Sequence, residues 1–222
     1  FTHDPGMYPK RLLLSEARRL GVRILPLDVN HSTNEYFVQR WPASTKDDPE
    51  IGIRMALTEV QGISEGEIQR IIENQPYQDV ADFYLRARPS RRTLERLALV
   101  GALDQLAGVD HHTRGDIVMR ARELNSVVKR PMLDPNQPTL NFEVLERIPT
   151  GNRNFTPEEK VRHELEILKL DVTQHSLDQY REMLDEMGVV QSSELSSLRG
   201  KTEVLVAGVR VATQTPPMRS GK

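Results

Sequence analysis

The chain has 222 residues, of which 37% are hydrophobic and only 5% aromatic, and its formal net charge is −2. It can bury a core of Leu, Val and Ile in one large domain or two smaller ones, but it has no global basic field, so any nucleic-acid binding must come from a local patch. The absence of cysteine excludes disulfides, thiolate zinc sites and cysteine nucleophiles. No apolar run approaches the ~18 residues of a membrane span, so we expect a cytoplasmic protein without a membrane partner.

The first expected elements are a helix and a strand. Residues 9–20 have helical apolar spacing, and Gly21 should end the helix. Residues 22–30 alternate like a short strand, which Pro26 confines to a sheet edge. A polar connector should follow up to Pro49. The predicted buried face of the helix consists of Leu12, Leu13, Ala17 and Leu20.

A short glycine turn follows between two apolar helical patterns, at 55–60 and 68–72. Ser64 is a good N-cap for the second helix, and Glu67 three residues later completes a capping box. A helix N-terminus after a glycine turn can bind a phosphate oxygen through backbone N–H groups without reading a base. The pattern resembles a helix-hairpin-helix, with Ser64 in place of the usual second glycine; an ordinary αα-hairpin is the alternative. The candidate DNA-binding residues here are Gly62, Ile63, Ser64, Glu65 and Gly66.

The next segment predicts two more helices, from Asp79 and from Thr93, and repeats the hairpin logic in degenerate form up to Asp104. Between residues 86 and 96 it holds five arginines against one glutamate. A solvated helix start would explain such a run, but beside a phosphate-binding turn we favour DNA contact. The candidate residues are Arg86, Arg88, Arg91, Arg92 and Arg96, together with Gly101 at the second turn.

After an amphipathic helix over 116–128, residues 129–154 lose periodicity and become rich in proline. This extended loop carries Gln137, Leu140 and Phe142. An exposed Leu and Phe in a polar loop need a cover. Either a helix of the same chain or the apolar pocket of a partner would supply it.

The C-terminal part predicts two helices and a strand. Thr156, Pro157 and Glu159 form a strong start for a helix to about Leu170, and a second helix over 177–186 should end at Gly188. Residues 203–213 are β-rich, and a lone strand needs partners. We therefore expect a domain that continues beyond Lys222, and a chain that is a fragment of a longer protein.

Taken in order, these segments resemble the C-terminal portion of bacterial DNA polymerases of the C family, the polymerase III alpha-subunit type. The final string, ending in Thr-Gln-Thr-Pro-Pro, is most similar to the error-prone, damage-inducible branch. The resemblance implies a mainly α fold, a tandem helix-hairpin-helix domain with flanking helices followed by the first strand of a truncated OB-fold. The similar segments are 18–30, 51–72, 100–104, 159–177 and 204–217.

The implied domains are the end of the fingers region and a connector (1–50), the tandem hairpin domain (51–130), a loop with a clamp-binding motif (131–155), a helical linker (156–200) and the OB-fold start (201–222). In that loop Gln137, Leu140 and Phe142 match a Gln-x-x-Leu-x-Phe peptide that binds the bacterial sliding clamp. The implied partners are duplex primer-template DNA, that clamp and other accessory proteins of damage-response polymerases.

The resemblance also implies that the parent protein is a DNA-directed DNA polymerase, a nucleotidyltransferase that uses Mg²⁺ held by palm carboxylates upstream of Phe1. We expect no catalytic residue, metal site or cofactor in this fragment, and no activity of its own. The alternative is a helix-hairpin-helix accessory or scaffold region of another DNA repair protein. Assayable activity of the fragment would favour a nuclease or ligase accessory region, and a lack of DNA binding would favour a scaffold.

Overall fold

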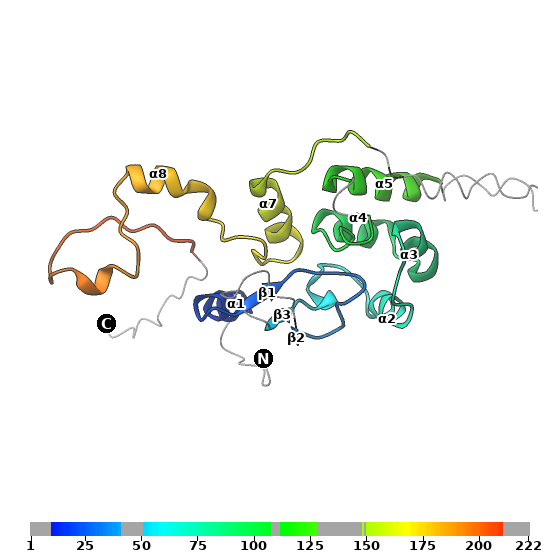
Figure 1. Cartoon of the computed structure of the whole chain (residues 1–222), viewed down its shortest axis with the longest axis horizontal. Coiled ribbons are helices and arrows are strands. Elements are labelled where there is room, and N and C mark those ends of the chain that lie inside the picture. The colour runs from blue at the N-terminus through cyan, green and yellow to red at the C-terminus, as the bar shows by residue number, and fades with distance from the viewer. Residues whose placement is uncertain (1–9, 41–50, 108–111, 128–147, 149, 211–222) are drawn as a thin grey trace, which may run out of the picture. The chain divides into compact units, whose positions relative to one another are not determined.

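The computed structural model describes residues 10–40, 51–107, 112–127, 148 and 150–210. The chain forms two compact units, Phe1–Thr173 and Gln174–Lys222. The larger unit is mainly helical, as predicted, and includes a small sheet (Figure 1). Its α-helices in the described residues are α1 (Lys10–Arg19), α2 (Glu65–Glu73), α3 (Val80–Ala87), α4 (Arg91–Leu99), α5 (Arg114–Val127) and α7 (Pro157–Ile167).

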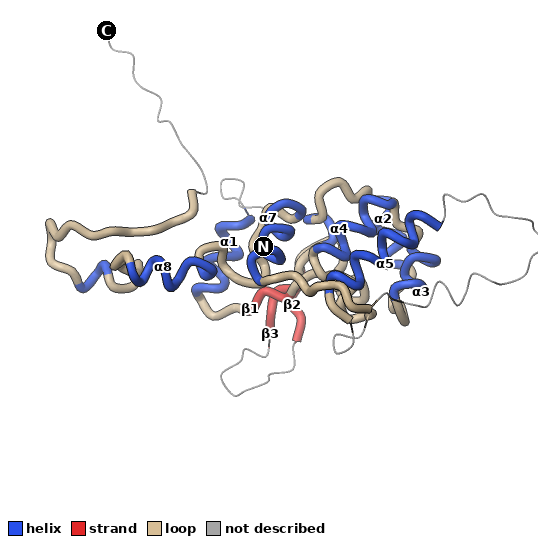
Figure 2. Tube along the Cα trace, turned by 90° about the horizontal axis from the view of Figure 1, so that it is seen from above, coloured by secondary structure: helices blue, strands red, loops and turns tan. Residues whose placement is uncertain are grey.

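The sheet has three strands, β1 (Arg23–Leu25), β2 (Phe37–Arg40) and β3 (Ile51–Arg54), in the order β1-β3-β2 (Figure 2). β1 runs parallel to β3, and β2 runs antiparallel to it. The predicted edge strand is confirmed, and Pro26 follows its last residue. The connector predicted up to Pro49 contains β2, so that prediction was wrong there. Because β1 pairs with β3, the sheet also crosses the boundary that the sequence placed after residue 50.

Helix α1 has nearly the predicted extent, and Ala17 of its predicted face packs partly against the core, but the residue it buries fully is Leu14. Leu14 is 3% exposed, whereas Leu12 and Leu20 are 42% and 67% exposed. Arg11 and Arg18 lie three residues before and four residues after Leu14, on the same side of the helix. Arg18 Nη2 donates to the Val172 carbonyl (2.6 Å), and Arg11 pairs with Asp171 (3.5 Å). These contacts turn the face of Leu14 inward.

Residues 55–60 are not the α-helix that their spacing predicted. They form an extended stretch and a single 3₁₀ turn, Leu57–Glu59. The N–H of Met55 donates to the Leu25 carbonyl, and that of Leu57 donates to the Thr33 carbonyl. Because the sheet and its following loop accept these bonds, the segment is drawn into an extended path, and both side chains are fully buried.

Helices α2, α3 and α7 begin where the sequence predicts, whereas α4 begins at Arg91 rather than at the predicted Thr93. Ser64, Asp79, Ser90 and Thr156 each accept a hydrogen bond from the first turn of the helix that follows. Both predicted capping boxes are present, on α2 and α7. Helix α4 packs against α5 and α7, and α2 packs against α3, so these helices form the body of the unit.

The chain after α7 still belongs to the larger unit. Leu168, Leu170 and Val172 are in the same core as α4 and α5. The buried carboxylate of Glu164 accepts hydrogen bonds from the N–H groups of Val172 (2.7 Å) and Thr173 (2.9 Å). The compact unit therefore ends inside the segment 156–200 that the sequence assigned to a linker.

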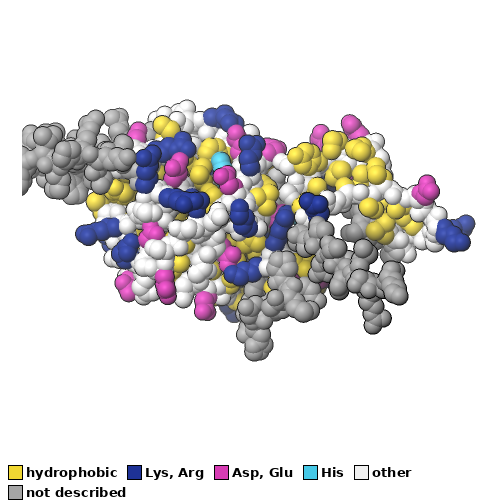
Figure 3. Space-filling model, turned by 180° about the vertical axis from the view of Figure 1, so that it is seen from behind, with side chains coloured by type: hydrophobic (Ala, Val, Ile, Leu, Met, Phe, Trp, Pro, Cys, Tyr) yellow, Lys and Arg dark blue, Asp and Glu magenta, His cyan; other side chains and the backbone are white. Residues whose placement is uncertain are grey.

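The smaller unit contains two 3₁₀ turns, Asp178–Tyr180 and Leu195–Ser197, around α8 (Arg181–Glu186). Residues 202–210, where the sequence predicts the first OB-fold strand, carry no strand, and the OB-fold start is not confirmed. Leu205 and Val206 are 48% and 58% exposed, and Figure 3 shows apolar side chains gathered on this unit. Among the described residues, no helix has the length and apolar character to cross a membrane.

Candidate nucleic-acid interface

Gly62 forms the turn before α2, with a φ of +79° that favours glycine. A Cβ placed on it would lie 3.0 Å from Nη1 of Arg96 and 3.9 Å from Cζ of Arg92. Both arginines belong to α4, some thirty residues further along the chain. The structure therefore brings the predicted turn and two of the predicted arginines together. We call Gly62, Arg92 and Arg96 the Gly62 surface.

Backbone donors are available at this turn. Gln61 donates its N–H to the Ile167 carbonyl at the end of α7 (3.0 Å), and Ile63 donates to Val60 (3.1 Å). Within the part of the chain that the structure describes, the N–H groups of Gly62, Glu65 and Gly66 donate to no partner. Such N–H groups can donate to a phosphate oxygen, and the N–H of Gly62 belongs to a residue that lies beside the guanidinium groups of Arg92 and Arg96.

Glu67 fixes the starts of α2 and α4 to each other. Its Oε2 accepts bonds from the N–H (3.1 Å) and hydroxyl (2.8 Å) of Ser64, and its Oε1 accepts from the N–H of Ser90 (2.7 Å), the N-cap of α4. Burial raises the pKa of Glu67, but the bonds from Ser90 and Ser64 outweigh it and lower the pKa to about 2. The carboxylate is therefore ionised at neutral pH and holds both helix ends.

The first turn of α4 is positively charged, whereas acidic residues are favoured at a helix N-terminus. It contains Arg91 and Arg92, both exposed, and no acidic residue. A helix N-terminus already carries partial positive charge, so cations there are unfavourable for the helix and favourable for an anion outside it. Burial and the charge of Arg92 lower the pKa of Arg96. Its Nη1 is buried and has no hydrogen-bond partner among the described residues.

The second predicted turn, at Gly101, is closed: side chains cover it, and its N–H groups are bonded within the chain. Gly101 also has a left-handed φ, +81°, but a Cβ there would lie 2.1 Å from Nη2 of Arg114 and 2.8 Å from the Asp104 carboxylate. Arg114 donates to Oδ2 of Asp104 through Nη2 (2.6 Å) and Nε (3.1 Å). The N–H groups of Gly101 and Ala102 are already donated to α4 carbonyls. The structure does not bring Gly101 into the Gly62 surface.

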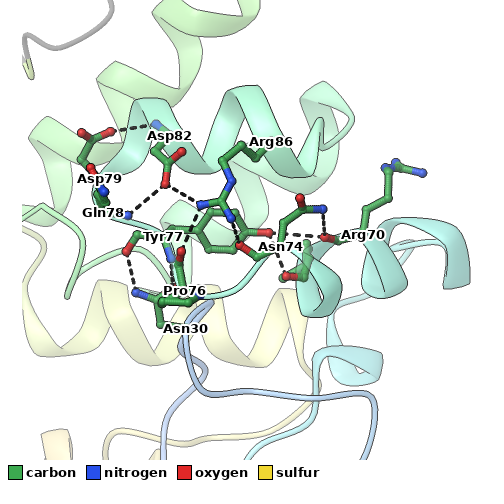
Figure 4. A network of polar contacts seen from close by, with 10 residues as sticks. Asn30, Arg70, Asn74, Pro76, Tyr77, Gln78, Asp79, Asp82 and Arg86 are labelled. Atoms are coloured by element: carbon green, nitrogen blue, oxygen red, sulfur yellow. Dashed lines mark hydrogen bonds and ion pairs between the residues drawn. The ribbon is translucent and has the colours of Figure 1, made fainter.

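Arg86 is also placed apart from that surface. Its Nη1 donates to the Asp82 carboxylate (2.9 Å) and the Pro76 carbonyl (3.0 Å), and its guanidinium lies 5.1 Å from the Tyr77 ring centroid (Figure 4). Arg88 ends α3 in a left-handed conformation, with its side chain exposed. Within the predicted arginine cluster, Arg86 is therefore hydrogen-bonded within the protein, whereas Arg88 is an exposed residue at a helix end.

The remaining predicted residues have varied places. Ile63 packs partly against the core, and Glu65 is an exposed acid beside the free donors, where it disfavours an anion. Gly66 lies under Arg70, whose Nη1 would be 3.6 Å from an added Cβ. The clamp-binding residues predicted at 137, 140 and 142 lie outside the described residues. No group of three His, Asp or Glu residues that could hold a metal ion occurs in the described ranges.

Sequence reasoning missed the residues that connect these elements. Nothing local indicates that Glu67 reaches Ser90 or that Arg114 covers Gly101, since each contact spans more than ten residues. The capping box was the only usable signal at Glu67. Arg70, which donates to the carbonyls of Ala87 (3.1 Å) and Arg88 (3.4 Å), was missed in the same way.

Residues 21–114, which include the Gly62 turn, α2, α3 and α4, match the family described as the helix-hairpin-helix motif. Nearly the whole chain is similar to error-prone DNA polymerases. The relative from Symbiobacterium thermophilum is 29% identical over 98% of this chain, and those from Dechloromonas aromatica and Pseudomonas aeruginosa are 30% identical over 97%. The resemblance found in the sequence is thus confirmed. The chain spans about a fifth of these relatives' length, 23%, 19% and 20% respectively.

Proposed function

We propose that the larger unit binds duplex DNA without sequence preference, as part of an error-prone DNA polymerase. The observation that carries the proposal is the Gly62 surface, a glycine turn with free N–H donors that lies against Arg92 and Arg96. The match of residues 21–114 to the helix-hairpin-helix motif supports it. The similarity to error-prone DNA polymerases supports primer-template DNA as the ligand.

The chemistry of this surface suits a phosphate rather than a base. Backbone N–H groups and guanidinium groups are both donors, and phosphate oxygens are acceptors on every nucleotide. Gly62 has no side chain to hold the DNA backbone away, and a Cβ would compete with Arg96 for the same space. Because Glu67 fixes the starts of α2 and α4 relative to each other, the donors of both helices are arranged before DNA arrives.

We propose DNA-directed nucleotidyl transfer as the activity of the parent polymerase. That reaction uses carboxylates that hold two metal ions at the incoming nucleotide. The described residues contain no such group of acidic residues, so we assign Mg²⁺ and the catalytic step to other parts of the protein. The present chain would hold the duplex, in the cytoplasm of a bacterium.

The test is the double variant Arg92→Ala, Arg96→Ala, titrated with labelled duplex DNA over a range of salt concentrations. Each lost phosphate contact lowers the slope of log affinity against log salt by about 0.9, so we expect a drop of about 2 and a weakening of roughly tenfold or more. The matched control is Arg181→Ala, Arg199→Ala, which removes two exposed arginines from the smaller unit. Equal affinities and slopes for the two double variants would overturn the proposal.

We also propose that Gln137, Leu140 and Phe142 bind a sliding clamp, which would raise the effective concentration of the polymerase on DNA. The support is the sequence pattern and its proline-rich setting. Changing Leu140 and Phe142 to Ala should abolish clamp binding, because two apolar anchors carry most of a short peptide's affinity. Gln137→Ala should weaken binding less, through one lost polar contact.

Calorimetric titration with a bacterial clamp, beside thermal melts, tests this second proposal. The melting temperature and the DNA affinity of the Leu140→Ala, Phe142→Ala variant should stay near those of the unmodified chain. A large loss of stability with clamp affinity intact would instead assign both residues to the protein's own core.

A further inference from the structure

Three non-glycine residues in the described part of the chain have a left-handed φ: Arg88 (+46°), Lys169 (+58°) and Lys201 (+69°). All three are cations, and all three are exposed. A Cβ is unfavourable in this conformation, and helices usually end in it with glycine or asparagine. None of the three positions therefore has the residue that its backbone prefers.

Lys169 occupies such a position at the end of α7. The residues on either side, Leu168 and Leu170, are 3% and 4% exposed. The left-handed turn at Lys169 lets both leucines enter the core while the lysine side chain remains in solvent. Glycine would allow the same path without the strain, so the fold alone does not account for the lysine.

The end of α7 is also the support of the Gly62 turn. The Ile167 carbonyl accepts the N–H of Gln61 (3.0 Å), the residue before Gly62. Lys169 follows Ile167 by two residues, a span of at most roughly 7 Å of chain. Glu166, the preceding residue of α7, is close enough to Arg96 to raise the pKa of its guanidinium, although burial and Arg92 outweigh that effect. Lys169 therefore lies at the margin of the Gly62 surface.

We propose that Lys169 binds a backbone phosphate of duplex DNA next to the phosphate held at the Gly62 turn. This inference rests on the proposed function and adds a residue that lies just beyond α7 and outside the matched motif, which ends at residue 114. A cation just beyond the C-terminal end of α7 also stabilises that helix, through the partial negative charge there. That role predicts an effect on stability only, so DNA binding separates the two accounts.

The experiment uses the whole chain with Lys169→Gly, Lys169→Asn and Lys169→Arg. Glycine and asparagine both accept the left-handed backbone and remove the charge, whereas arginine keeps it. We expect the first two variants to bind duplex DNA about three- to tenfold more weakly, with a salt slope lower by about 0.9, and Lys169→Arg to bind like the unmodified chain. Lys201→Gly is the matched control, since it removes a left-handed cation from the smaller unit, and its affinity should not change.

The double variant Arg92→Ala, Arg96→Ala belongs in the same titration. If it loses affinity while Lys169→Gly and Lys169→Asn keep theirs, Lys169 serves only the helix end and the inference is overturned, although the proposed function stands. If neither the double variant nor the Lys169 variants change affinity, the proposed function fails and the inference fails with it. Lower melting temperatures with unchanged affinity would likewise assign Lys169 to the helix end.

Discussion

The two glycine turns of the larger unit have nearly the same backbone and opposite surroundings. Gly62 and Gly101 have φ values of +79° and +81°, and an apolar residue lies close before each. At Gly62 the N–H of the glycine itself donates to no partner among the described residues, and two arginines of α4 lie beside it. At Gly101 the N–H is bonded, and the Arg114–Asp104 pair covers the turn.

A left-handed glycine turn alone therefore does not leave its N–H groups available to a ligand. The accessibility of each turn depends on the side chains that pack over it, and these side chains come from distant parts of the chain. Helix α4 brings to Gly62 an arginine, Arg96, whose buried Nη1 has no hydrogen-bond partner among the described residues. Helix α5 brings to Gly101 an arginine, Arg114, that is paired with the carboxylate of Asp104. A tandem repeat in sequence is therefore compatible with one open turn and one closed turn.

The largest expected effect compares alanine at the two turns. Gly101→Ala should lower the free energy of unfolding by about 2–4 kcal/mol, because a left-handed Cβ is strained and because it displaces the Arg114–Asp104 pair. Gly62→Ala should cost only about 1–2 kcal/mol, since the end of the Arg96 side chain can move aside. Denaturant unfolding of both variants measures the difference.

The same variants should have the reverse order in DNA binding. Gly62→Ala pushes Arg96 from its position and narrows access to the free N–H groups, whereas Gly101→Ala disturbs no available donor. Duplex titrations at a temperature where both variants are folded would check this. A Gly101→Ala chain that loses more affinity than the Gly62→Ala chain would break the distinction between an open and a closed turn.

The next prediction concerns Glu67, which holds α2 and α4 together on the open side. Its pKa is about 2 in the folded chain against an ordinary value of 4.5. Its contribution is therefore present above pH 4.5 and is lost as pH falls toward 2. Glu67→Gln should lower the free energy of unfolding by about 1–2 kcal/mol at pH 7, and this deficit should shrink between pH 4.5 and 2.

Glu159→Gln is the matched control for Glu67→Gln. Glu159 occupies the same third position in the capping box of α7, but it is more exposed and bonds to Thr156 and Arg153 rather than to a second helix start. Its substitution should change stability less. Equal, pH-independent deficits in the two variants would show that Glu67 does not join the two helices through its charge.

Elements held by interactions between residues close in sequence could be predicted, and elements held by contacts between distant residues could not. Ser64, Asp79 and Thr156 predict helix starts, because each side chain accepts a hydrogen bond from the N–H only three residues later. Met55 to Val60 looked helical by spacing, yet bonds to Leu25 and Thr33 gave an extended path. Leu14 replaced Leu12 in the core because Arg11 and Arg18 reach the chain around Asp171, 160 and 153 residues away.

The candidate site followed the same rule. Gly62 was visible as a turn glycine, and the charge of Arg92 and Arg96 was visible as a cluster, so their meeting could be predicted. The contact of Arg114 with Gly101 could not be predicted, because nothing in the sequence indicates which residue an arginine thirteen positions later will contact. Arg86 belongs to the arginine-rich run that predicted DNA contact, but in the structure its guanidinium is bonded to Asp82 and Pro76.

Arg86 gives the smallest expected effect and sharpens the comparison within the arginine cluster. Arg86→Ala removes hydrogen bonds to Asp82 and to the carbonyl of Pro76, together with the contact on Tyr77, all around the turn between α2 and α3. Because the side chain is 40% exposed, we expect a loss of only about 1 kcal/mol in the free energy of unfolding. Arg92→Ala should do the opposite and lower DNA affinity without lowering stability.

Thermal melts and salt titrations of Arg86→Ala and Arg92→Ala therefore form a complete test. The salt slope should fall by about 0.9 for Arg92→Ala and remain constant for Arg86→Ala, since a guanidinium already bonded within the protein releases no counterion from DNA. If Arg86→Ala lowers the slope as much as Arg92→Ala does, Arg86 leaves its bonds when DNA binds. The whole run from 86 to 96 would then act as one cationic surface, as its composition predicts.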